Sequence, residues 1–64
     1  MLREKIGTIV GKRTVTIWRR EEGGYEVESE AFEEFGISAW PVGTERMAGQ
    51  VAESVAATGR PVFG

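Results

Sequence analysis

The stretch from Arg13 to Glu28 constrains the fold of this chain most, because it has the pattern of a β-hairpin with two different faces. Residues 13–20 are β-branched and aromatic with arginines at both ends, residues 25–28 alternate apolar or aromatic residues with glutamates, and glycines separate the two runs. This pattern is typical of two antiparallel strands joined by a tight turn. We therefore expect one sheet face to form the core and the other to be a candidate contact surface.

The length of the hairpin loop decides which residues share a face. A two-residue loop, Gly23-Gly24, would place Val15 and Ile17 beside three glutamates. A three-residue loop over 22–24 shifts the pairing by one residue and so reverses the faces. We prefer the longer loop because it separates apolar from charged residues. It pairs Ile17 with Ser29, Arg19 with Val27, Arg20 with Glu26, Trp18 with Glu28 and Thr16 with Glu30.

A second turn is predicted at Gly11-Lys12, where a type II′ turn would have glycine first. It would pair Val10 with Arg13 and Ile6 with Ile17, so that Ile6 and Val10 join the core face. The two turns together predict a three-stranded antiparallel meander over about residues 4–30.

The second half of the chain predicts a helix over about 44–58, with Thr44 as the N-cap and Gly59 just past the end. Residues 31–43 are expected to be a loop, or to include a short strand at 36–40 that Pro41 closes. Residues 59–64 are expected to form a short tail. Apolar residues follow one stripe of the helix: Met47, Ala48, Val51, Ala52, Val55 and Ala56.

These elements predict a single small α+β domain over 1–64. Its fold would be a three- to four-stranded antiparallel meander with one C-terminal amphipathic helix packed on it. Part of the helical stripe could instead meet a second copy of the chain. The predicted core between sheet and helix is Ile6, Val10, Val15, Ile17, Tyr25, Val27, Met47, Val51 and Val55.

Composition limits the chemistry of the chain. Its 64 residues include no cysteine, histidine or aspartate. Nucleophilic, acid–base and metal-assisted catalysis lack their usual residues, so we predict no enzyme activity, no catalytic or metal-ligating residues and no cofactor. Short chains without disulfides or metals often need a partner chain. We therefore expect a homo-oligomer, a dimer or higher, with Trp18 and Trp40 as candidate interface anchors.

The N-terminal residues do not resemble a signal peptide, and no apolar run approaches the roughly 20 residues of a membrane span. These observations favour a cytoplasmic, soluble protein with no membrane partner.

Charge is unevenly distributed although the net charge is only −2. Residues 1–20 hold six basic residues and one glutamate, whereas residues 21–34 hold seven glutamates and no basic residue. These carboxylates could simply be solvated, or they could form a surface for a basic protein partner, such as a toxin. The candidate partner-binding residues are Glu26, Glu28, Glu30, Glu33 and Glu34.

An alternative function is nucleic-acid binding through the basic and aromatic residues of the second strand, namely Arg13, Trp18, Arg19 and Arg20. The glutamates across the hairpin would repel phosphates, so we rank this alternative lower. A third possibility is a structural or assembly subunit.

Two segments resemble bacterial toxin–antitoxin antitoxins. Residues 21–29, followed by Gly36 and a helix opening at Thr44-Glu45, are similar to the small sheet module of HicB-type antitoxins, without that family's Pro-Gly loop. Residues 45–62 are similar to the helix and following strand of Phd/YefM-type antitoxins. The two families differ in fold, so at most one resemblance can be homology. The resemblance implies a role in binding a partner protein.

Overall fold

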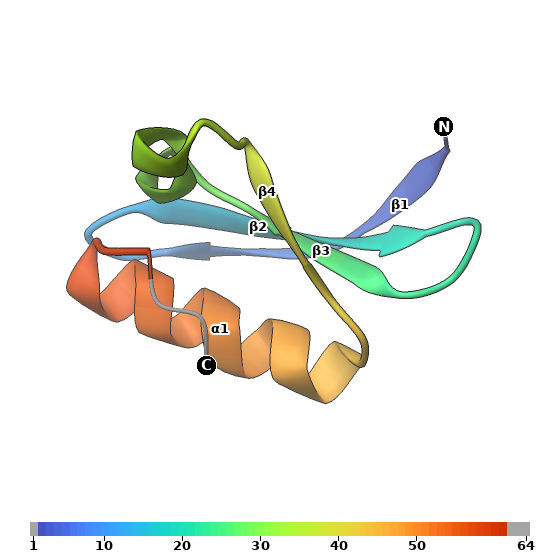
Figure 1. Cartoon of the computed structure of the whole chain (residues 1–64). Helices are drawn as coiled ribbons and strands as arrows, with labels where there is room; N and C mark the ends of the chain where they lie inside the picture. Colours follow the sequence, from blue (N-terminus) through green and yellow to red (C-terminus); the bar gives the residue numbers. More distant parts are fainter. Residues whose placement is uncertain (1, 62–64) are drawn as a thin grey trace.

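The computed structural model describes residues 2–61, which form an antiparallel sheet with a helix packed on one face (Figure 1). The strands lie in chain order, β1-β2-β3-β4, which confirms the α+β meander with a C-terminal helix. The part of the predicted tail beyond residue 61 lies outside the described residues. The elements are β1 (Arg3–Val10), β2 (Thr14–Arg20), β3 (Tyr25–Glu28), the 3₁₀ helix η1 (Glu30–Phe35), β4 (Ala39–Val42) and α1 (Glu45–Thr58).

The ends of α1 are those that the sequence predicts. The Thr44 hydroxyl accepts a hydrogen bond from the Met47 N–H at 3.1 Å, which satisfies one of the free amides of the first turn. Gly59 ends the helix in the left-handed region, with φ 71°, and its N–H donates to the Val55 carbonyl at 2.8 Å.

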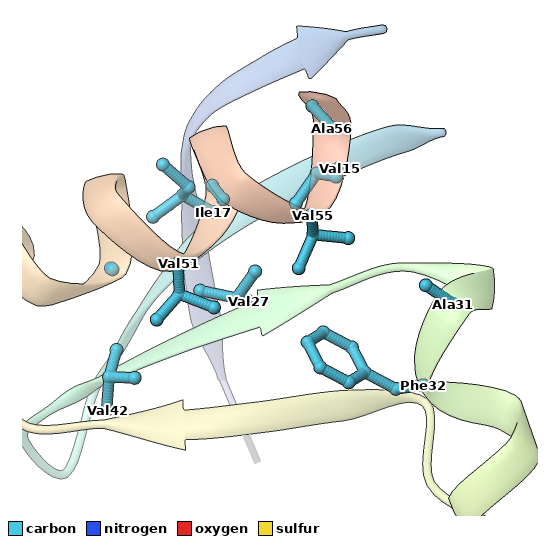
Figure 2. Packing of buried hydrophobic residues seen from close by; sticks show 11 residues of the cluster. Val15, Ile17, Val27, Ala31, Phe32, Val42, Val51, Val55 and Ala56 are labelled. Carbon is cyan, nitrogen blue, oxygen red and sulfur yellow. The ribbon is translucent and has the colours of Figure 1, made fainter. Parts of the chain in front are cut away.

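The core lies between α1 and the sheet face that α1 covers (Figure 2). Five predicted core residues are buried there: Val15, Ile17, Val27, Val51 and Val55. Tyr25 is partly buried against them. The cluster also contains Val42 from β4, Ala31 and Phe32 from η1, and the alanines Ala48, Ala52 and Ala56 of α1.

The β2–β3 hairpin keeps the predicted faces, but its register differs by two residues. Ile17 pairs with Val27, and Arg19 pairs with Tyr25. The loop has three residues as predicted, but they are 21–23, because the Arg20 N–H donates to the Gly24 carbonyl at 3.0 Å. Side chains alternate with a period of two, so this shift leaves every residue on its predicted face. The predicted opposite pairs of Arg20 with Glu26, Trp18 with Glu28 and Thr16 with Glu30 are therefore wrong.

The β1–β2 register differs from the prediction by one residue over 7–10, where the faces change, and returns to the predicted pairing for residues 3–5. The turn has three residues, Gly11 to Arg13, so Val10 pairs with Thr14 and Ile9 with Val15. Ile9 therefore packs against the core, whereas Val10 is 78% exposed. Ile6 lies at a β-bulge and is also exposed. The prediction that Ile6 and Val10 belong to the core is wrong.

The longer turn is stabilised by contact with the end of α1. The Lys12 N–H donates to the Ala56 carbonyl at 2.7 Å, which satisfies one of the carbonyls that a helix end leaves free. Gly11 approaches so closely that a Cβ there would lie 2.5 Å from the Ala56 oxygen. The turn thus adopts the form that fits the helix rather than the form that the Gly-Lys pair prefers locally.

Two further predictions need correction. Met47 is 48% exposed, because α1 turns Ala48 and Val51 toward the sheet and leaves Met47 on its flank. The fourth strand covers Ala39–Val42 rather than 36–40. It includes Pro41, which an edge strand tolerates because one row of its amides has no partner strand.

Replacing Val51 with alanine should lower the free energy of unfolding by about 1–3 kcal/mol, because it leaves a cavity between α1 and the sheet. Met47→Ala is the matched control in the same helix and should change stability by less than about 0.5 kcal/mol, since its side chain is half exposed. Urea denaturation followed by circular dichroism measures both. Equal losses in the two variants would contradict this packing of α1.

Gly11→Ala should destabilise the fold by about 1–3 kcal/mol, because the added methyl group meets the Ala56 backbone. Gly49→Ala should have the opposite sign and stabilise by about 0.5–1 kcal/mol, since it lies in a helix interior with no atom near the added carbon. Thermal melts of the two variants test the contact directly. A Gly11→Ala protein as stable as the wild type would show that the turn does not need this close approach.

Candidate functional site

The sheet face turned away from α1 carries a polar cluster centred on Trp18. The indole Nε1 of Trp18, on β2, donates a hydrogen bond to Glu28 Oε1 on β3 at 2.9 Å. The guanidinium of Arg3, on β1, lies over the indole ring with Cζ 4.0 Å from the ring centroid. A cation over an aromatic ring contributes about 0.5–1 kcal/mol at an exposed site. Three neighbouring strands therefore meet at this one ring.

The same cluster neutralises two of the candidate carboxylates. Arg3 Nη1 lies 3.3 Å from Glu26 Oε2, and its Nη2 lies 3.4 Å from Glu28 Oε2. Arg20 approaches Glu26 from the other side, with Nε 3.7 Å from Oε1. Each partly exposed pair stabilises by only about 0.2–1 kcal/mol, but together they cancel the charge of this face. We call Arg3, Trp18, Arg20, Glu26 and Glu28 the Trp18 cluster.

The other three candidate carboxylates, Glu30, Glu33 and Glu34, lie on η1, and we call them the acidic end. The backbone of η1 is fixed by a cap at each end and by one side chain that is buried in the core. The Ser29 hydroxyl accepts a hydrogen bond from the Ala31 N–H at 3.2 Å, and Gly36 ends the element in the left-handed region. Phe32 is fully buried and points into the core (Figure 2). A fixed backbone therefore presents these carboxylates to solvent.

The acidic end keeps most of its charge. Glu30 Oε2 lies 3.7 Å from Arg13 Nη1, and both side chains are largely exposed, so the pair neutralises little in water. Within residues 2–61 no ion pair involves Glu33 or Glu34. A polar cleft of about 640 Å³ lies beside η1, and its lining includes Arg13, Arg60 and the three carboxylates.

The structure thus divides the predicted acidic surface into two parts. Glu26 and Glu28 belong to the Trp18 cluster and already have cations of the chain beside them. The acidic end lies beyond β3, on the segment that leads to β4.

The four residues of the nucleic-acid alternative do not share a surface. Trp18 and Arg20 lie on the face turned away from α1, but Arg3 covers the Trp18 ring on which a base would stack. Arg19 points to the opposite side of β2 and forms an ion pair with Glu4. Arg13 lies in the turn and faces Glu30.

Sequence reasoning missed two residues that shape these sites. Arg3 lies opposite Arg20 in the predicted register and in the observed one, because the bulge at Ile6 restores the predicted pairing for residues 3–5, but the sequence did not indicate that its side chain covers Trp18. Phe32 fixes η1, and here a signal existed. Ser29 and Gly36 flank a six-residue element as an N-cap and a left-handed C-cap would.

Comparison with protein-family models, curated proteins and solved structures finds no match to this chain. Within residues 2–61, no group of three or more acidic side chains is placed to hold a metal ion. The described part of the chain also contains no helix that is long and apolar enough to cross a membrane.

Proposed function

We propose that this chain is a small protein-binding module, antitoxin-like or regulatory, that presents the acidic end to a basic protein partner. One observation carries the proposal: the chain pairs Glu26 and Glu28 with its own arginines, whereas Glu33 and Glu34 form no ion pair within residues 2–61, although Arg13 and Arg60 line the same cleft. Unpaired carboxylates on a rigid element are available to a partner without first breaking an internal ion pair.

Electrostatics favours such a use of the acidic end. Complementary charges accelerate the encounter of two proteins and orient it, and a fixed backbone reduces the entropy that is lost on binding. η1 is fixed by its two caps and by buried Phe32. The resemblance to antitoxins agrees with this role, since a toxin that acts on RNA commonly presents a basic site.

Replacing Glu30, Glu33 and Glu34 together with glutamine should slow association with the basic partner by about tenfold or more, and the effect should shrink at high salt. A matched control replaces Glu21, Glu45 and Glu53 with glutamine. This control changes the net charge equally but on other surfaces, and its residues, like Glu33 and Glu34, have no ion pair in residues 2–61.

Partners are identified by mass spectrometry of proteins from the source cells that the immobilised chain retains, and rates are then measured by surface plasmon resonance. Basic proteins retained by the wild type and the control, but lost from the acidic-end variant, support the proposal. Equal retention by both variants would refute a role for η1.

Nucleic acids should bind poorly. We expect no affinity tighter than about 10 µM for mixed duplex or single strands near 150 mM salt, within the range of roughly 1–100 µM of nonspecific binding. The reason is that carboxylates accompany the basic residues Arg13 and Arg20 and that Arg3 covers Trp18. A gel-shift titration measures this. Sub-micromolar, salt-sensitive binding that Arg13→Ala and Arg20→Ala abolish would reverse our ranking.

The cytoplasmic location and the absence of enzyme activity stay predictions from the sequence. Self-association also stays a prediction from the sequence.

A further inference from the structure

The two edges of the sheet are not equivalent. β4 has four residues and includes Pro41, which has no N–H to offer a further strand. β1 has eight residues, and most of them are exposed. Long, exposed edge strands are the sites at which another strand can add to a sheet. The β1 edge is therefore the candidate site for the addition of another strand.

The hydrogen-bond pattern identifies the backbone groups at this edge. Arg20 bonds toward β3, through its N–H to Gly24, and Glu21 bonds toward β1, through its N–H to Leu2. Successive residues of a strand bond to opposite sides, so Val15 and Ile17 bond toward β1, to Ile9 and Gly7. Thr8 lies between Gly7 and Ile9, and Val10 follows Ile9. Both residues therefore direct their N–H and C=O groups to the open edge.

The side chains along this edge are uncharged, and the two large apolar ones, Ile9 and Val10, are incompletely covered. Val10 is 78% exposed, and Ile9, on the α1 side, is only partly buried. The segment from Gly7 to Gly11 contains no charged residue. It thus lacks the charged side chains that commonly protect an edge strand, although the bulge at Ile6 limits the straight part to this segment.

We propose that a second copy of this chain adds to the sheet here, with β1 antiparallel to β1 about a twofold axis at Ile9. In this register Thr8 of each copy lies opposite Val10 of the other, so the outward N–H and C=O groups of both residues pair. The two Ile9 side chains meet on the α1 side, and the Thr8 and Val10 side chains meet on the other face. Gly7 lies opposite Gly11, where small residues avoid a clash.

Self-complementarity favours a second copy over an unrelated peptide as the occupant. The register that pairs all outward groups of Thr8 and Val10 also places Ile9 against Ile9 and the β-branched side chain of Thr8 against that of Val10. The residues that flank the segment are mostly basic: Lys5, Lys12 and Arg13. In the dimer these cations approach those of the other copy, so salt should strengthen this contact, whereas it should weaken binding of a basic partner to the acidic end.

Sedimentation equilibrium at micromolar concentrations tests this pairing in the intact chain. The wild type should have a dimer mass, and its dissociation constant should fall as salt is added. Thr8→Pro removes an outward N–H that the monomer does not use and should weaken the dimer by about tenfold or more. Thr8→Ala keeps the N–H and should dimerise like the wild type.

Circular dichroism and tryptophan fluorescence show whether Thr8→Pro remains folded. If it does not, Val10→Lys gives the decisive result, because that side chain is exposed in the monomer and adds like charge at the axis. A wild type that stays monomeric, or a folded Thr8→Pro or Val10→Lys protein that dimerises normally, would overturn the proposal. The variant with glutamine at Glu30, Glu33 and Glu34 should still dimerise, which separates this result from the partner test.

Discussion

The hydrogen bond from the Lys12 N–H to the Ala56 carbonyl connects the first turn of the chain to the end of its helix. It fixes a three-residue turn, and this turn decides the register of β1. A turn one residue shorter would have buried Val10 and exposed Ile9. A contact between segments more than 40 residues apart therefore decides which β1 side chains pack in the core and which remain at the open edge.

The bulge at Ile6, which shifts the register back, determines how charge is distributed. After the bulge at Ile6, Arg3 lies on the same face as Trp18 and is close enough to contact Glu26 and Glu28. Without Arg3, Glu28 would have no cation paired with it in residues 2–61 and Glu26 would keep only Arg20. With it, the sheet face is nearly neutral and η1 carries the unpaired charge. The position of β1 thus concentrates the negative charge on one short, rigid element.

Local sequence signals were sufficient wherever local forces decide the structure. Thr44 and Gly59 predicted both ends of α1, because caps act within one turn. The alternation along β2 and β3 predicted the correct faces even though the register was wrong by two residues. A shift by an even number of residues leaves every side chain on the same face of the sheet. The β1 turn could not be predicted, because its form depends on the Ala56 carbonyl. For the candidate site, the carboxylates were identified from the sequence, but their division into a neutralised and an unpaired group depends on Arg3.

The two proposed contacts use different parts of the sheet. The turn after β1 reaches the acidic end through Arg13 and Glu30, but the open edge of β1 faces away from β2 and β3, so a strand-paired dimer would leave Glu33 and Glu34 of both copies exposed. Such a dimer would be bivalent. If the basic partner were itself oligomeric, the second contact would form at a high effective concentration, and weak individual sites could then give tight overall binding. A module this small can bury only a limited area at each contact, and bivalency would compensate for that limit without any additional contact within one protomer.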